Sequence, residues 1–131
     1  MLTAVLNTSG GANADDLFRN LMTYNPFRRQ FMDAYCIVDG SVFEPTRCEQ
    51  IVRDIYNNVN PALRFEGSST GTGLISTIRS AYNGSRINTL RNYLSLSYGL
   101  YVTLSANIPE ARLSVNGQEI PTGNFAGYLF S

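Results

Sequence analysis

Three arginines and two tyrosines are the residues of this chain best suited to bind a partner. They are Arg79, Tyr82, Arg86, Arg91 and Tyr93. No acidic residue occurs between Gly67 and Pro109, so these three positive charges are unopposed in sequence. Arginine contacts phosphate and tyrosine stacks on bases, but the same two side chains are also typical of protein interfaces. Because three charges are few for nucleic acid, we predict an exposed helical face or a protein interface, with nucleic-acid binding as the alternative.

A glycine-rich loop precedes the predicted helix that carries Arg79. Its last residues, Gly71, Thr72 and Gly73, are weak candidates for an anion site, because backbone N–H groups at a helix start point towards a bound anion. The loop lacks the lysine followed by serine or threonine that a phosphate-binding Walker loop needs, and its spacing fails the dinucleotide fingerprint. A surface loop without a ligand is the favoured interpretation.

The chain has no histidine, and all ten of its cationic side chains are arginines. This composition removes the usual general base and the lysine nucleophile, and it leaves paired carboxylates as the main catalytic device. The acidic residues of the first half show no spacing that singles out a pair; they include Asp33, Asp39, Glu44, Glu49 and Asp54. We therefore predict that the protein is not an enzyme and uses no cofactor.

Cys36 and Cys48 are the only cysteines. Without histidine they fall short of the four ligands of a structural zinc site, and neither thiol has a histidine partner to activate it as a nucleophile. We predict two free thiols in a reducing compartment rather than a disulfide, and no metal site.

The first half of the chain has helical patterns. Asn13 caps a helix that ends near Tyr24, and Asn25-Pro26 restarts it, because proline is tolerated in the first turn. The result is two short helices or one kinked helix. Arg28 and Arg29 are expected on a solvated or interfacial face of this second helix. Residues 36–44 fit two structures: a small hairpin that turns at Asp39-Gly40, or a helix end capped by Gly40.

A third helix is predicted from the capping-box spacing of Thr46 and Glu49 and from apolar residues that recur at the helical period as far as Val59. Asn60-Pro61 should end it, and residues 62–65 should be extended. A fourth helix is expected from residue 74 to its closure at Asn83-Gly84, and Ser85 is expected to cap another helical turn or two.

The last third has strand patterns. Apolar and small or polar residues alternate without a break from Leu94 to Ser105, which predicts one long strand bent at Gly99 or two strands folded about it. Asn116-Gly117 is a good type I′ hairpin turn, and residues 125–130 should form a final strand.

Together these patterns predict one α+β domain over residues 1–131, with amino-terminal helices (about 13–92) packed on a mainly antiparallel sheet built from the carboxy-terminal half (about 93–131). The net charge is zero and only 15% of residues are charged, so little repulsion opposes self-association. We predict a self-associating structural, assembly or protein-interaction protein of the kind found in viruses and phages. Its expected partner is a second copy, as a homodimer or larger assembly. No secretion signal or membrane span is seen, which favours a cytoplasmic or virion-associated location.

Overall fold

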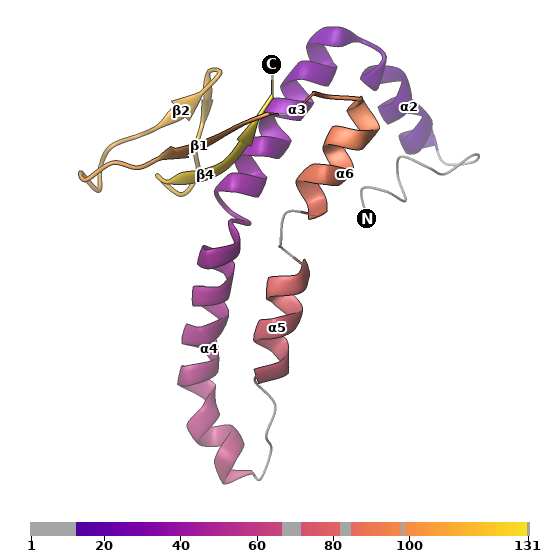
Figure 1. The fold of residues 1–131 in the computed structure, drawn as a ribbon. Helices are drawn as coiled ribbons and strands as arrows, with labels where there is room; N and C mark the ends of the chain where they lie inside the picture. Colours follow the sequence, from indigo (N-terminus) through magenta and orange to yellow (C-terminus); the bar gives the residue numbers. More distant parts are fainter. Residues whose placement is uncertain (1–12, 67–71, 82–84, 98, 131) are drawn as a thin grey trace.

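The computed structural model describes residues 13–66, 72–81, 85–97 and 99–130, and within them helices precede strands, so the α+β prediction is confirmed (Figure 1). The helices are α2 (Asn13–Met22), α3 (Asn25–Gly40), α4 (Pro45–Phe65), α5 (Thr72–Ala81) and α6 (Ser85–Leu94). The strands are β1 (Leu100–Leu104), β2 (Ser114–Val115), β3 (Gln118–Glu119) and β4 (Phe125–Leu129).

The strands form two antiparallel pairs. β1 pairs with β4 in a register that places Leu100 opposite Leu129 and Leu104 opposite Phe125. β2 and β3 form the predicted hairpin around Asn116 and Gly117, whose φ angles of 51° and 79° are both positive, as a type I′ turn requires. The mainly antiparallel arrangement is therefore confirmed, but the described strands divide into two small sheets.

The break between α2 and α3 lies at Thr23-Tyr24, directly before the Asn25-Pro26 pair that was predicted to restart the helix, and the N-cap is Tyr24 instead of Asn25. Of the two structures proposed for residues 36–44, the hairpin is wrong and the helix end is right, because α3 continues to Gly40, although the cap is Ser41 instead of Gly40. The reason is packing: the aromatic ring of Phe125 lies where a side chain at position 40 would be, so α3 ends against β4 at its one glycine.

Helix α4 corrects three predictions. Its cap is Glu44 instead of Thr46, since the Glu44 carboxylate accepts hydrogen bonds from the backbone N–H groups of Thr46 (3.0 Å) and Arg47 (2.7 Å). Pro61 lies inside the helix instead of ending it, and residues 62–65 are helical instead of extended. Pro61 lacks one N–H donor, but it lies on an exposed part of α4, and the helix continues for another turn.

The alternating run from Leu94 to Ser105 is a strand only in its second half. Leu94 is the last residue of α6, and the chain leaves the helix through Ser95, whose φ is +52°. The N–H of Leu96 donates to the carbonyl of Arg91 (3.0 Å) and that of Ser95 to Asn92 (3.3 Å), the two bonds of a Schellman motif. The alternating pattern thus spans the end of α6 and strand β1, and it does not mark a single strand.

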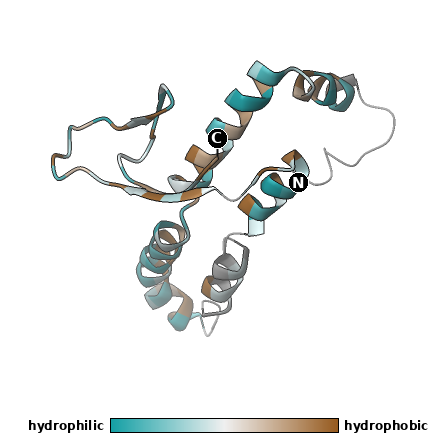
Figure 2. Ribbon diagram, turned by 45° about the horizontal axis from the view of Figure 1, so that its top comes forward, coloured by the Kyte–Doolittle hydropathy of each residue, from teal (hydrophilic) through white to brown (hydrophobic). Residues whose placement is uncertain are grey.

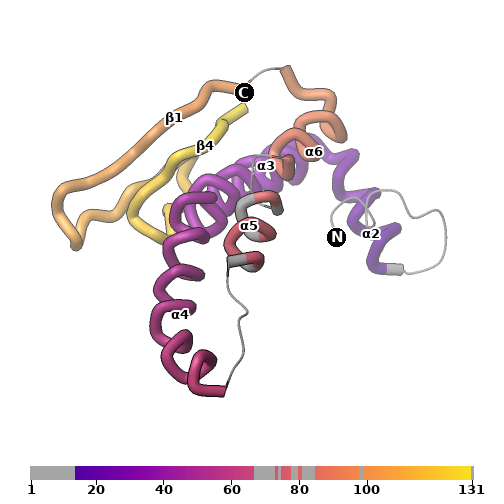
Figure 3. The backbone as a smooth tube through the Cα atoms, turned by 60° about the horizontal axis from the view of Figure 1, so that its bottom comes forward, coloured from indigo at the N-terminus to yellow at the C-terminus, as the bar shows by residue number. Residues whose placement is uncertain are grey.

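Two groups of buried side chains hold together a body made of α2, α3, α6 and the four strands. One group joins α2, α3 and α6 around Leu90, and the other joins α3 to the strands around Phe125. Brown, hydrophobic segments lie where α3 meets the strands (Figure 2). Helices α4 and α5 pack side by side and extend away from this body as an arm (Figure 3). Among the side chains that the structure describes, the buried core therefore lies in the body.

Candidate interaction surfaces

The predicted arginine and tyrosine residues fall on different elements. Arg86, Arg91 and Tyr93 belong to α6, and Arg79 belongs to α5, although its side chain and the whole of Tyr82 lie outside the described part of the chain. Arg91 lies five positions after Arg86, which places the two residues about 140° apart around the helix axis. These two guanidinium groups therefore point to different sides of α6.

The side chain of Arg86 lies over the corner between α3 and α4. Its guanidinium carbon is 5.0 Å from the centre of the Phe43 ring, a cation–π contact, and its backbone carbonyl accepts a hydrogen bond from Tyr35 Oη (3.3 Å). Burial raises the pKa of the Asp39 carboxyl, and the positive charge of Arg86 partly opposes that shift. Arg86 therefore joins the end of the body to the start of the arm, and a role in binding a partner stays a prediction.

The predicted anion loop is described only in part. Gly71 lies outside the described residues, Thr72 opens α5, and the carbonyl of Gly73 accepts hydrogen bonds from the hydroxyls of Ser76 (2.8 Å) and Thr77 (2.9 Å). Both bonds use the Gly73 carbonyl as acceptor, so they do not show whether the backbone N–H groups of the first turn bind an anion. The anion site stays a prediction.

Both cysteines are free thiols. Burial, together with the smaller effect of the nearby carboxylates of Asp33 and Asp39, raises the pKa of Cys36 to about 12. Burial also raises the pKa of Cys48. At neutral pH both groups are therefore protonated, a state unsuited to nucleophilic attack. Among the residues that the structure describes, no three metal-ligating side chains gather in one place.

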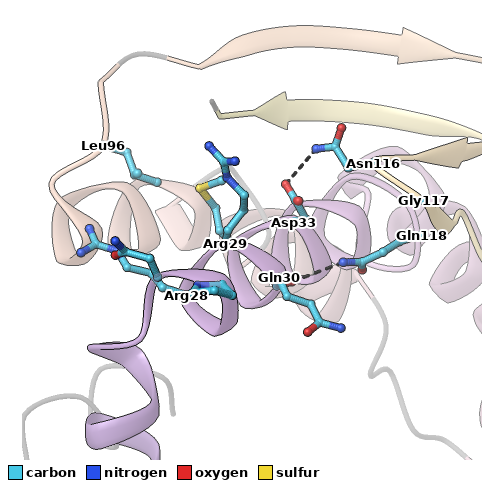
Figure 4. A pocket seen from close by; sticks show the side chains of 11 residues that line it. Arg28, Arg29, Gln30, Asp33, Leu96, Asn116, Gly117 and Gln118 are labelled. Atoms are coloured by element: carbon cyan, nitrogen blue, oxygen red, sulfur yellow. Dashed lines mark hydrogen bonds between the residues drawn. The ribbon is translucent and has the colours of Figure 1, made fainter.

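A cavity of about 850 Å³ lies between the first turns of α3 and the β2–β3 hairpin (Figure 4). Asp33 is buried beside it, with 7% of its surface exposed, and accepts a hydrogen bond from Asn116 Nδ2 (3.0 Å). Gln118 Nε2 donates to the carbonyl of Gln30 (3.4 Å). These bonds tie the hairpin to α3 across more than eighty residues of sequence.

Two arginines also line this cavity. The Arg28 guanidinium donates to the carbonyl of Leu94 at the end of α6, so it is engaged in the fold. Arg29 is exposed at the cavity, as the sequence predicted for a solvated face. The arrangement is polar and open, and its hydrogen bonds account for the conformation of the hairpin.

The arm presents an apolar surface that the sequence did not distinguish from a core. No residue of α4 is buried, although the helix has 21 residues. Ile51, Ile55 and Val59 follow one another at four-residue intervals, so they form one line along the helix, and they are 40%, 57% and 43% exposed. We call these three residues the α4 line. Helical periodicity predicted that they share a face, but it could not show how much of that face stays exposed.

Comparisons with known protein families, curated proteins and solved structures found no match. Separately, none of the described helices is both long and apolar enough to cross a membrane.

Proposed function

We propose that this protein is a non-enzymatic assembly domain that associates with further copies of itself through the arm. One observation carries the proposal: α4 has an apolar line along its length, yet none of its residues is buried. An amphipathic helix in water normally derives its stability from an apolar face packed against another element. A structural or assembly protein of a virus or phage, cytoplasmic or virion-associated, is the kind of protein that this surface and the neutral composition fit.

The expected strength of association follows from the exposed area. Full burial of an isoleucine or valine contributes about 1.5–3 kcal/mol, and the α4 line is already about half-buried, so each of its residues has roughly 1 kcal/mol left to gain. Six such side chains from two copies give roughly 6 kcal/mol against an association cost of about 4–15 kcal/mol. We therefore expect weak, concentration-dependent pairing, which several contacts in a larger assembly would strengthen.

Electrostatics offers no opposition to this association. Ten arginines balance ten acidic residues, so two copies approach each other without net repulsion. On α4 itself, Arg53 pairs with Glu49 (2.5 Å), and Gln50 bonds to Asp54 (2.8 Å). These polar pairs lie to the side of the α4 line and leave its apolar surface open.

Sedimentation velocity over a wide concentration range tests the proposal. The wild type should shift from monomer to larger species, and Ile55→Gln should weaken the association by at least about tenfold, since one polar group then enters the contact from each copy. Leu100→Gln is the matched control, because Leu100 is 72% exposed but lies on β1, outside the arm. Equal weakening by both substitutions would show that the arm is not the contact.

The alternative function, nucleic-acid binding through the arginines and tyrosines between positions 79 and 93, is tested with the same samples. Such binding would weaken steeply as salt is added, because it releases counterions from phosphates. A chain that stays monomeric at every concentration and binds RNA or DNA with a clear salt dependence would overturn the assembly proposal and support this alternative.

A further inference from the structure

We propose that Asn116 is a site of spontaneous deamidation, and that its conversion to aspartate or isoaspartate weakens the attachment of the β2–β3 hairpin to α3. The proposal goes beyond the proposed function, because it concerns the body and needs no second copy. Three observations on the hairpin carry it: the glycine that follows Asn116, the exposure of the turn, and the hydrogen bond from Asn116 to Asp33.

The pair Asn116-Gly117 favours an attack of the chain on its own side chain. The backbone nitrogen of the residue that follows an asparagine can bond to the side-chain carbon Cγ, which closes a five-membered succinimide ring and expels the amide nitrogen as ammonia. Glycine permits this close approach better than other residues, because it has no Cβ. Asparagine is accordingly one of the thermolabile residues of proteins.

The turn leaves the reacting groups open to water. Asn116 and Gly117 are both exposed, and a Cβ at Gly117 would meet nothing within 4 Å. Val115 and Gln118 pair to close the two-residue turn, so the N–H of Gly117 lies outside the ladder of β2 and β3. One water molecule can therefore open the ring. Breaking the bond from the Gly117 nitrogen to Cγ gives aspartate, and breaking its bond to the backbone carbonyl carbon gives isoaspartate.

The hydrogen bond to Asp33 determines what this reaction changes. Asn116 Nδ2 donates to Asp33 Oδ1 (3.0 Å), and the bond joins the tip of the hairpin to α3 (Figure 4). Asp33 is only 7% exposed, so its carboxylate depends on donors from the protein. Both products lose the Nδ2 donor and gain a carboxylate, which accepts hydrogen bonds but donates none. Two carboxylates then lie close together where a donor met an acceptor, and they repel each other.

The same bond makes the change one-way. It holds the Asn116 side chain towards Asp33, whereas the attack requires that side chain to rotate towards Gly117. The reaction therefore starts when the tip of the hairpin briefly leaves α3. Afterwards the ammonia is gone, and repulsion from Asp33 opposes the return of the tip. A further bond between tip and helix, from Gln118 Nε2 to the carbonyl of Gln30, is 3.4 Å long and does not offset this loss.

Mass spectrometry of aged wild-type protein tests the site. Trypsin cleaves after Arg112 and releases a peptide that contains both Asn116 and Asn124. Asn124 is the internal control, because it is also exposed but is followed by Phe125, whose side chain hinders the attack. After prolonged incubation at neutral pH, fragment masses should show conversion at Asn116 and none at Asn124, relative to a fresh sample digested in parallel. An unchanged Asn116, or equal conversion at both positions, would overturn the proposal.

The same measurement in guanidinium chloride tests the restraint by Asp33. Conversion of Asn116 should be several times faster in the unfolded chain, because Asp33 no longer holds its side chain. Equal rates in the folded and unfolded protein would contradict that restraint.

Substitution tests the structural consequence. Asn116→Asp carries the same carboxylate as one of the products and should raise the equilibrium constant of unfolding at least about tenfold, because the buried Asp33 loses its donor. Asn124→Asp adds the same charge at another exposed position and should change that constant by less than about twofold. Urea unfolding at neutral pH measures both. Equal effects would show that the added charge acts without Asp33.

The double variant Asp33→Asn with Asn116→Asp is the matched control. It exchanges donor and acceptor, so the hydrogen bond can form again between one amide and one carboxylate, as in the wild type. It should recover most of the stability that Asn116→Asp loses. A double variant as unstable as Asn116→Asp would contradict the contact with Asp33 as the cause.

Discussion

The body and the arm are built from similar amphipathic helices but differ in what covers them. In the body, Leu90 of α6 and Phe125 of β4 are 0% and 1% exposed, because α3 packs between α6 and the strands. In the arm, α5 packs along α4, and no residue of α4 is buried. An apolar stripe in the sequence thus determines which residues share a helix face. Whether that face is buried depends on a second element that packs on it, and this element can belong to another molecule.

The largest expected difference between the two regions concerns core truncation. Phe125→Ala should destabilise the protein by about 3–5 kcal/mol, because it leaves a cavity between α3 and β4. Ile55→Ala on the exposed α4 line should change the stability of the monomer by less than about 1 kcal/mol. Chemical denaturation at low protein concentration measures both values. Equal losses would abolish the distinction between body and arm.

Alanine substitutions at two glycines, one in the body and one in the arm, should change the free energy of unfolding in opposite directions. A Cβ at Gly40 would lie 2.4 Å from Cε2 of Phe125, whose buried ring has no room to move, so Gly40→Ala should destabilise by about 1–3 kcal/mol. A Cβ at Gly73 in α5 would meet nothing within 4 Å, so Gly73→Ala should stabilise the arm by roughly 0.5–1 kcal/mol. Thermal unfolding followed by circular dichroism compares them. A stabilising Gly40→Ala would show that α3 and β4 do not pack this closely.

The corner between body and arm should respond to pH through Asp39. Burial raises the pKa of this carboxyl in the folded protein, so folding favours its protonated form, and stability falls as pH rises from the unfolded pKa through the folded one. Asp39→Asn should therefore be more stable than wild type at neutral pH, and the gain should disappear below about pH 4. Urea unfolding at several pH values measures the difference. A gain that is constant with pH would contradict this assignment.

Local signals in the sequence predicted much of the fold. Asn25-Pro26 marked the break between α2 and α3, and Asn116-Gly117 marked the hairpin, because both depend on backbone preferences of adjacent residues. Pro61 was wrongly predicted to end α4, because the loss of a single backbone hydrogen bond on an exposed helix does not end the helix. The alternating run that begins at Leu94 was wrongly predicted to be strand throughout, because the end of a helix and a following strand can together give one alternating pattern.

The candidate surfaces were less predictable than the elements. Asn116 was identified as a turn residue, but its hydrogen bond to Asp33 joins positions 83 residues apart, and no local pattern reports such a contact. Arg86 was identified as a partner-binding candidate, and the structure places it over Phe43. Ile55 was identified as apolar and helical, and only the three-dimensional arrangement shows that the body leaves it exposed.

Hydrogen exchange measured at low and high protein concentration tests self-association through the arm most directly, because it reports on body and arm in one experiment. The account predicts that amides of α4 exchange more slowly as concentration rises, while those of α3 and β4 keep the same protection. Exchange of α4 that is independent of concentration, in a sample concentrated enough for association, would contradict the assignment of the arm as the assembly surface.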